Sequence, residues 1–316
     1  MIRSPGSSAE MPVHWFPAKP ARVATRRANV IFPTRLGKSS RLLAAVAALS
    51  LAPCIAQATS IPVTSGLMVH VAADDIDNNS GTAPTAGTVT AWKNLSTDGA
   101  SIGDFSGTGA VVLNELNGLP VVRFNGTSNQ FENATDVANT AASDLTIFAV
   151  ADSNDANAGG IFQFRDANAS GWLFRYQNET GALYGHAGSS PNITAAFSND
   201  FHLLVLARDG LNVTLSVDGA AGASNTVAGY IASPTSASTR IGTDRFSTGD
   251  SYLAGDIAEI IVYNRPLSLS EINQVGYYLE AKYGLNTAFV PEPSSISMLL
   301  FGCAMPWLAS RKRRRQ

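Results

Sequence analysis

The turn dipeptides of this chain constrain its fold more than any other feature. Asn117-Gly118, Asn125-Gly126, Asp209-Gly210 and Asp218-Gly219 supply residues that tolerate the positive φ angles that hairpin turns require. Many short strands separated by such turns predict a sandwich or a barrel. We expect strands at 66–72, 89–93, 110–113, 119–125, 145–152, 160–165, 171–177, 182–186, 202–208, 212–217, 239–242 and 253–263.

The last of these segments leads into the one convincing helix. Its β-branched run ends at Asn264 to Pro266, because proline removes a donor from the strand ladder. Ser268 is then suited to cap a helix that runs to about Tyr283, with Glu271 in the capping-box position. Gly284 follows the helix, as is typical of a C-terminal cap.

The N-terminal region has the pattern of an export signal. Residues 1–41 are basic with almost no acidic residues, residues 42–52 are apolar, and Ala56-Gln57-Ala58 has the small-x-small pattern of a signal-peptidase site. We therefore assign 1–58 to the export region and place the mature start near Thr59. Because the basic stretch is long, two alternatives stay open: translation begins downstream of Met1, or Arg26-Arg27 belongs to a twin-arginine signal.

The C-terminal residues 290–316 form a tripartite tail. Pro291-Glu292-Pro293 precedes an apolar segment at 296–309 and a basic cluster at 311–315. A helix over the apolar segment would reach about 21 Å, short of a bilayer core of about 30 Å. The tail resembles the PEP-CTERM sorting signal, which implies export, transient membrane contact and processing by an exosortase-like protease. An ordinary membrane anchor is the alternative; in both cases the basic cluster stays cytoplasmic and 59–290 lies outside.

The region between the two ends is acidic and free of cysteine. Of the 22 Lys and Arg residues, 8 precede Thr59 and 5 follow Ala309, whereas 22 of the 24 Asp and Glu residues lie between, so this region carries a net charge of −13. Such a surface repels phosphate backbones, which argues against nucleic acid as a partner. Both cysteines, Cys54 and Cys303, lie in the end regions, so packing rather than disulfides must stabilise the domain.

The order and spacing of several segments resemble a known family. These segments are Asn117 to Gly126, Leu145 to Val150, Val217 to Gly219, Ile241-Gly242, Ala254 to Ser268 and Lys282 to Leu285. Together they resemble the LamG-like jelly-roll domains of the concanavalin A-like superfamily. The resemblance implies two antiparallel sheets packed face to face. Members of the superfamily bind glycans or proteins, some bind calcium, and others are glycoside hydrolases.

Aromatic side chains are the first candidates for ligand binding. Trp172, Phe174 and Tyr176 alternate along one expected strand and so share a face, with Arg175 on the other face. If that face is open, Trp172 and Tyr176 are the best contacts for a sugar ring, because aromatic faces stack on its CH groups. If it is closed, the three rings belong to the core.

A polar loop offers a candidate calcium site. Asp75, Asp77 and Asn79 occupy alternate positions, as at the start of a calcium loop. The match then fails, since Ser80 replaces the expected glycine and Ala86 stands where a bidentate acid is required. A solvated acidic turn is the alternative, and no other cofactor is expected.

The catalytic signals are weaker. Asp256 and Glu259 are three residues apart, so a regular strand would place them on opposite faces, and the Glu-x-Asp-x-x-Glu signature of the superfamily's retaining hydrolases is absent from the chain. His70, His186 and His202 show no spacing typical of a metal site or a catalytic triad, and we interpret each as a strand residue with a hydrogen-bonded ring.

The sequence therefore predicts an all-β protein: a two-sheet antiparallel jelly-roll sandwich at 59–289 with one short C-terminal helix. Its predicted role is a non-catalytic module, exported to the cell envelope or extracellular matrix, that binds a glycan or an extracellular protein. Two alternatives stay open, a divergent glycoside hydrolase or lyase and a purely structural matrix protein.

Overall fold

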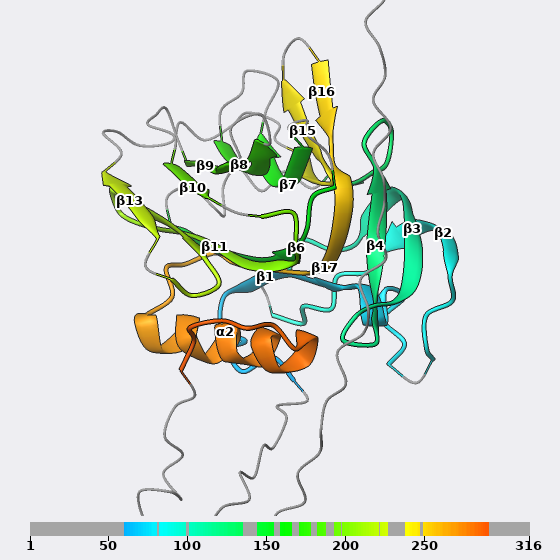
Figure 1. The fold of residues 1–316 in the computed structure, drawn as a ribbon, viewed down its shortest axis with the longest axis horizontal. Helices are drawn as coiled ribbons and strands as arrows, with labels where there is room; N and C mark the ends of the chain where they lie inside the picture. Colours follow the sequence, from blue (N-terminus) through cyan, green and yellow to red (C-terminus); the bar gives the residue numbers. More distant parts are fainter. Residues whose placement is uncertain are drawn as a thin grey trace, which may run out of the picture. The chain divides into compact units, whose positions relative to one another are not determined.

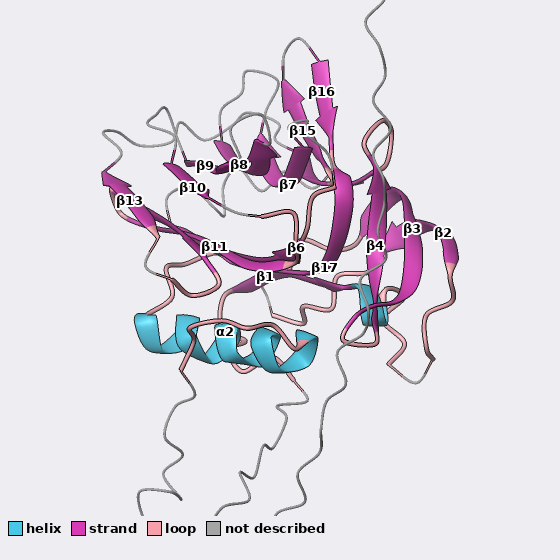
Figure 2. Ribbon diagram, viewed as in Figure 1, coloured by secondary structure: helices cyan, strands magenta, loops and turns pink. Residues whose placement is uncertain are grey.

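The expected antiparallel strands form one large curled sheet in the computed structural model (Figures 1 and 2). The structure describes residues 60–290 except 81, 99–100, 135–143, 155–158, 166–170, 178–181, 188–192, 197, 221, 227–237 and 247–248. The elements are β1 (Leu67–Ala72), η1 (Ala73–Asp75), β2 (Gly87–Trp92), β3 (Phe105–Leu116), β4 (Leu119–Asn125), β5 (Gln130–Asn133), β6 (Leu145–Ala151), β7 (Gly159–Arg165), β8 (Gly171–Gln177), β9 (Ala182–Ala187), β10 (Ile193–Ala196), β11 (His202–Asp209), β12 (Asn212–Val217), β13 (Ala223–Thr226), β14 (Ser238–Ile241), β15 (Thr243–Phe246), β16 (Gly249–Tyr252), β17 (Ala254–Tyr263) and α2 (Leu269–Tyr283).

The curled sheet folds into two layers. One layer, which we call the front sheet, has the strand order β10-β9-β8-β7-β14-β5, and the back sheet has the order β4-β17-β6-β11-β12-β13. Strand β3 belongs to both layers, because its first half pairs with β5 and its second half with β4. Figure 1 shows β7, β8 and β9 above β6 and β11. The expected all-β jelly-roll sandwich is thereby confirmed.

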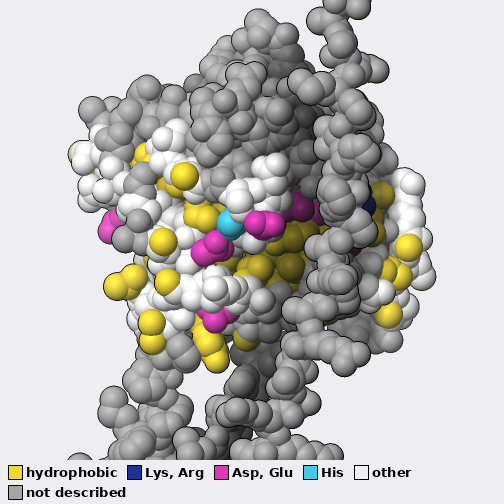
Figure 3. Space-filling view, viewed as in Figure 1, with side chains coloured by type: hydrophobic (Ala, Val, Ile, Leu, Met, Phe, Trp, Pro, Cys, Tyr) yellow, Lys and Arg dark blue, Asp and Glu magenta, His cyan; other side chains and the backbone are white. Residues whose placement is uncertain are grey.

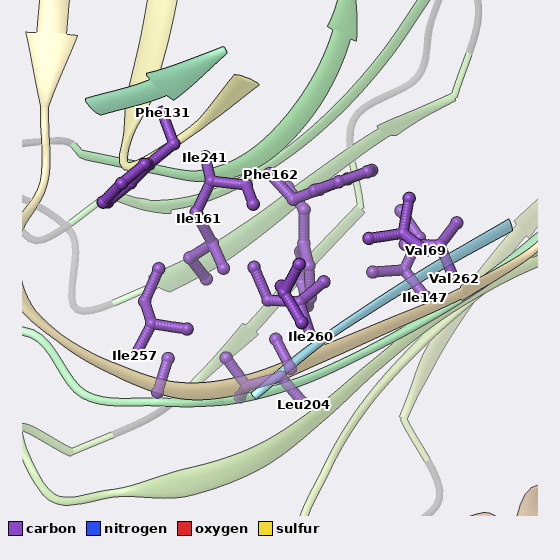
Figure 4. Packing of buried hydrophobic residues seen from close by; sticks show 14 of the residues in the cluster. Val69, Phe131, Ile147, Ile161, Phe162, Leu204, Ile241, Ile257, Ile260 and Val262 are labelled. Carbon is purple, nitrogen blue, oxygen red and sulfur yellow. The ribbon is translucent and has the colours of Figure 1, made fainter. Parts of the chain in front are cut away.

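The main core lies between the two layers. Aliphatic and aromatic side chains from both sheets meet there, among them Phe131 and Phe162 from the front sheet and Ile147, Ile257 and Ile260 from the back sheet (Figure 4). Each of these five side chains is fully buried. Since complete burial of one such side chain contributes about 1.5–3 kcal/mol, packing alone can stabilise a domain without disulfides.

Strand β17 is central to the back sheet and carries a β-bulge. It pairs with β1, β4 and β6, and its register with β6 shifts between Ile257 and Glu259. Before and after the bulge, Ile257 and Ile260 point into the main core, whereas Ala258 and Ile261 lie in a second cluster on the outer face. The bulge thus adds a residue to the outer face without disturbing the core.

Helix α2 covers that outer face. Ser268 and Glu271 form the predicted capping box, and Gly284 ends the helix with a φ of 63°, so both predicted helix boundaries are confirmed. Val275 and Leu279 pack on the back sheet, and the chain beyond the helix returns so that Phe289 lies against Gly276. A Cβ on Gly276 would come within 2.5 Å of the Phe289 ring, which explains why the smallest residue stands there.

The hairpin signals differ in detail. In Asn117-Gly118 both residues have positive φ, as the favoured two-residue hairpin turn requires, and these two residues join β3 to β4. Asp218 and Gly219 also have positive φ, but they lie in the longer connection between β12 and β13. In Asn125-Gly126 the glycine has positive φ, and the Asn125 Oδ1 accepts N–H bonds from the three residues that follow Gly126. This side chain therefore organises a longer loop rather than a tight turn.

Candidate functional site

Polar side chains form a row across the outer face of the front sheet. Ser106 of β3 lies opposite Glu132 of β5, and Glu132 lies opposite Arg240 of β14. Arg240 in turn lies opposite Gln163 of β7. Since neighbouring residues such as Phe131 point into the core, the pleat directs this row outward.

An open pocket of about 730 Å³ lies at the β3 end of this row. Ser106 and Glu132 belong both to the row and to the pocket. We call it the front-sheet pocket; its walls are Ile102, Gly103, Asp104, Ser106, Glu132, Asn133 and Ala134. It offers two carboxylates and a hydroxyl, which are groups that hydrogen-bond to polar ligands.

The wall around Asp104 is held by hydrogen bonds. The Asn133 Nδ2 donates to the backbone oxygens of Ile102 and Asp104, at 3.0 and 2.6 Å. Asp104 Oδ1 accepts the Asn94 N–H at 3.0 Å, and Oδ2 lies 2.7 Å from Lys93 Nζ. The bond from Lys93 lowers the pKa of Asp104, with burial acting the other way. Asp104 is therefore fixed as an acceptor before any ligand arrives.

Glu132 is paired with a nearly buried arginine. Arg240 Nη2 lies 3.0 Å from Glu132 Oε1, and the Arg240 side chain is 8% exposed whereas that of Glu132 is 36% exposed. The guanidinium holds one carboxylate oxygen in place, and the exposure of Glu132 leaves the side chain accessible from the pocket. Two carboxylates at one pocket meet the first requirement for glycoside hydrolysis, but the lowered pKa of Asp104 is opposite to that of a general acid.

The structure places Tyr176 in the core. Its side chain is fully buried, and its hydroxyl donates to the Ala151 backbone oxygen at 2.9 Å. Arg175 points the other way, as expected, and its Nη1 lies 2.8 Å from Asp244 Oδ2. Trp172 is in the same strand, β8, but its side chain is outside the described residues, so a sugar contact at Trp172 stays a prediction.

The candidate calcium residues use their side chains locally. Asp77 Oδ1 accepts the Asn79 N–H at 3.2 Å, and Asn79 Nδ2 donates to Thr82 Oγ1 at 2.9 Å. Asp75 ends η1, and its Oδ1 is buried without a hydrogen-bond partner. Among the described residues, no three Asp, Glu, His or Cys side chains are grouped as a metal site would require. Calcium binding by Asp75, Asp77 and Asn79 stays a prediction.

Asp256 and Glu259 both point to the outer face of the back sheet. The expectation of opposite faces, which assumed a regular strand, is wrong because the bulge inserts one residue between them. The two acids have separate partners. Asp256 binds the Arg123 guanidinium through two bonds of 2.8 and 2.6 Å, and its N–H donates to Asp152 Oδ1 at 2.6 Å. Burial raises the pKa of Asp152 to about 7.

Glu259 lies at the centre of a buried network beneath α2. Its carboxylate contacts His70 Nε2 at 2.8 Å, Lys282 Nζ at 2.7 Å and the Tyr283 hydroxyl at 2.8 Å. Lys282 also contacts Asp74 at 2.9 Å. Burial alone would raise the pKa of Glu259, but Lys282 and His70 outweigh it and lower the pKa to about 2. Because the carboxylate is fully buried and fully paired, the network stabilises the fold and offers no access to a ligand.

Acidic side chains gather at the centre of the face drawn in Figure 3, beside a histidine and a hydrophobic area. Lys and Arg are nearly absent among the coloured side chains of that face.

The described residues contain no helix with the length and hydropathy that a membrane span needs. The signal residues Ala56 and Ala58 and the sorting motif Pro291, Glu292 and Pro293 lie outside the described residues.

The fold and the pocket together define a class: a jelly-roll sandwich with an open polar pocket on one sheet. More specifically, residues 125–273 match the family model Laminin_G_3, described as the concanavalin A-like lectin/glucanases superfamily. The match supports the LamG-like jelly-roll domain that the sequence predicts. No curated protein sequence matches the chain.

Several solved structures are similar at low identity. A sialidase from Trypanosoma rangeli in complex with 2,3-difluoro-KDN has a TM-score of 0.48 and 15% identity, with 70% of this chain and 33% of the sialidase covered. The CBM40 of a Ruminococcus gnavus IT-sialidase, bound to α2,3-sialyllactose, has a TM-score of 0.42 and 14% identity, with 50% of this chain and 95% of the CBM40 covered. This chain thus spans about a third of the length of the Trypanosoma rangeli sialidase.

The residues that line the front-sheet pocket, and Arg240 beside it, were not predicted from the sequence. The strand around Arg240 was expected at 239–242, so its outward direction could have been deduced from the alternation with Ile241. Its partner Glu132 is 108 residues away in β5, a strand that was not expected. Spacing in a single sequence gives no signal for such a pair.

Proposed function

We propose that this protein is an exported binding module whose front-sheet pocket holds a glycan without cleaving it. The observation that carries the proposal is the meeting of Asp104, Ser106 and Glu132 at one open pocket on the outer face of a jelly-roll sheet. Carboxylates accept hydrogen bonds from sugar hydroxyls, and a serine hydroxyl both donates and accepts. The match to a lectin/glucanase superfamily supports the same function.

The partners of Asp104 and Glu132 favour glycan binding over glycan hydrolysis. Asp104 is held by Lys93 with a lowered pKa, and Glu132 is paired with Arg240. A glycosidase needs one carboxylic acid that stays protonated to donate to the leaving group. A divergent hydrolase is nevertheless the competing function, because two carboxylates do line the same pocket, and hydrolysis must be assayed alongside binding.

The proposal includes delivery to the cell surface. The apolar and basic order of residues 1–58 and the Pro-Glu-Pro tail at 290–316 support export followed by sorting through an exosortase-like pathway. Mass spectrometry of the protein from its native cells tests this part. We expect an N-terminus near Thr59 and loss of the basic cluster at 311–315, and an intact chain in the cytosol would contradict it.

The binding test compares two equivalent substitutions. We would screen the purified full-length chain on a glycan array, then measure affinity for the best glycan with Glu132→Gln and Glu115→Gln. Glu115 is a half-exposed acid paired with Arg123, as Glu132 is paired with Arg240, but it lies outside the pocket. We expect Glu132→Gln to weaken binding about tenfold, as the loss of a charge-assisted hydrogen bond implies, and Glu115→Gln to leave it unchanged.

Two outcomes would overturn the proposal. One is equal affinity in the two variants, which would place the site elsewhere. The other is release of reducing sugar from the bound glycan, abolished by Glu132→Gln, which would make the pocket an active site.

A further inference from the structure

A serine, a histidine and an aspartate are joined by short hydrogen bonds at the start of β11. His202 is the first residue of this strand, and its two ring nitrogens have different partners. Nδ1 lies 2.6 Å from Asp218 Oδ2, and Nε2 lies 2.9 Å from Ser198 Oγ. A carboxylate, an imidazole and a hydroxyl in this order are the parts by which serine hydrolases activate a nucleophile, and they are recognised by geometry rather than by chain position.

The fold holds Asp218 in place. It occupies the turn after β12 with a φ of 53°, and its N–H donates to the Leu203 backbone oxygen at 2.8 Å. Its Oδ1 accepts the Leu203 N–H at 2.9 Å, so Oδ2 is left to face the imidazole. An acceptor at Nδ1 favours the tautomer that carries its proton there, so that Nε2 faces Ser198 as an acceptor.

Ser198 is exposed to solvent, whereas the His202 side chain is largely buried. Ser198 and its neighbours Asn199 and Asp200 are exposed, whereas the His202 side chain is 14% exposed. Asp200 Oδ2 lies 2.9 Å from Ser198 Oγ and competes with His202 for the hydroxyl proton. The bond to Asp218 raises the pKa of His202, burial opposes this shift, and Asp200 adds to it. The imidazole is therefore a base only above this raised pKa.

We propose that Ser198 is a nucleophile toward carboxylic esters, with His202 as its base and Asp218 as the positioning residue. Ser198 Oγ attacks the ester carbonyl carbon as its proton moves to His202 Nε2. The carbon–oxygen bond of the ester breaks, and the alcohol leaves with that proton. Water then attacks the acyl-serine through the same base, which releases the carboxylic acid and restores Ser198.

The surroundings indicate the class of ester. Asp200 and Asp218 place negative charge beside the serine, which disfavours phosphate esters and suits a neutral acyl group. Because Ser198 lies on an exposed loop, the acyl group can be carried by a large molecule. The Ser198 N–H points to His202 Nε2 at 3.3 Å, so another donor must hold the oxyanion, and we expect slow turnover.

A fluorophosphonate label reports the nucleophile directly, since the serine oxygen displaces fluoride in a single step. We would treat the full-length chain with the label and quantify modified peptides by mass spectrometry. Ser268 is an internal control, because its Oγ also lies 2.9 Å from a carboxylate oxygen, that of Glu271, at a helix cap. We expect Ser198 to react at least about tenfold faster than Ser268, because only Ser198 contacts a histidine base.

Three variants and a pH series distinguish general-base action by His202 from a purely structural role. His202→Gln should slow the labelling of Ser198 about a hundredfold, within the range of general-base effects, and Ser198→Ala should abolish release of nitrophenol from p-nitrophenyl acetate above the background rate. Asp200→Asn should leave the labelling unchanged or faster. Labelling of the unmodified chain should rise with pH in a single step that lies above the ordinary pKa of histidine, because the pKa of His202 is raised.

The proposal is overturned if Ser198 and Ser268 react at the same rate, or if a folded His202→Gln variant reacts as fast as the unmodified chain. If that variant does not fold, the pH series decides: a rate that follows hydroxide concentration without a step near the His202 pKa would overturn it. Slower labelling in Asp200→Asn would also contradict it, because Asp200 and not His202 would then be the proton acceptor. None of these results depends on glycan binding by the front-sheet pocket.

Discussion

Each sheet carries, on its outer face, a glutamate paired with a cation, but the two glutamates differ in their exposure to solvent. On the front sheet, Glu132 is paired with Arg240, and the Glu132 side chain stays 36% exposed at an open pocket. On the back sheet, Glu259 is paired with Lys282, and its side chain is 0% exposed beneath α2. Both are carboxylates on strands with a cation at hydrogen-bond distance. The difference is local coverage, because helix α2 closes the site of Glu259 whereas Glu132 lies at an open pocket.

Whether solvent reaches the carboxylate decides whether the pair can contact a ligand. A buried carboxylate must have all of its hydrogen bonds made within the protein, and Glu259 obtains them from His70, Lys282 and Tyr283. A half-exposed carboxylate such as Glu132 can exchange water for a ligand at little cost. We therefore assign stability to the back-sheet network and binding to the front-sheet pocket.

Removal of the buried cation should have the largest effect. Lys282→Met leaves Glu259 and Asp74 without their shared partner, and a buried carboxylate without its cation typically costs about 3–5 kcal/mol. Urea unfolding at pH 7 measures this loss. Lys93→Met is the matched control, since it breaks the pair with Asp104, whose two side chains are 43% and 45% exposed. We expect the control to stay within about 1 kcal/mol of the unmodified protein. Equal losses would remove the distinction between the two faces.

Acid should weaken the back-sheet network next. The pKa of Glu259 is lowered from 4.5 to about 2, so its contribution is fully present above pH 4.5 and is lost as the pH falls toward 2. A shift of this size corresponds to about 3 kcal/mol. Unfolding free energies measured from pH 6 to pH 3 should therefore fall less steeply in Glu259→Gln than in the unmodified chain. Parallel curves would show that Glu259 carries no such linkage.

Asp152 should show the opposite pH dependence. Burial raises its pKa from 3.8 to about 7, so the stability associated with its protonated form is lost as the pH rises through 7. Asp152→Asn stays neutral and keeps an oxygen for the Asp256 N–H. Its stability relative to the unmodified protein should increase by about 2 kcal/mol between pH 5 and pH 8. A difference that is constant over this range would contradict the raised pKa.

Much of the fold could be predicted from the sequence, because local signals agree with tertiary packing where strands are apolar. Strand β17 and helix α2 carry a β-branched run, a capping box and a terminal glycine, and all three act within a few residues. Five short strands, β5, β10, β13, β15 and β16, were not expected, whereas β14, which is equally short, was. Such strands are defined by their neighbours and not by their own pattern.

The candidate sites were harder to predict, because they depend on contacts between distant residues. Ser198 and His202 are only four residues apart, but Asp218 reaches His202 because β11 and β12 pair in one register. Likewise, Glu259 joins the network beneath α2 only because of a bulge, which alternation of side chains cannot reveal. Tyr176 shows the converse, since its alternation with Phe174 was read correctly but could not distinguish an open face from the core that encloses both rings.

The smallest expected effect gives the sharpest comparison of the two faces. Glu132→Gln and Glu259→Gln are the same chemical change, and each keeps an oxygen that can accept a bond from its cation. At the front-sheet pocket, the side chain of residue 132 is 36% exposed and water can solvate the new amide, so we expect a loss of about 1 kcal/mol or less in urea unfolding. Beneath α2, Lys282 would keep only Asp74 as a charged partner in a site closed to water, so the loss should be clearly larger. If Glu132→Gln were instead the more destabilising of the two, the front-sheet pair would be a structural element, and the pocket would lose its claim to be a binding site.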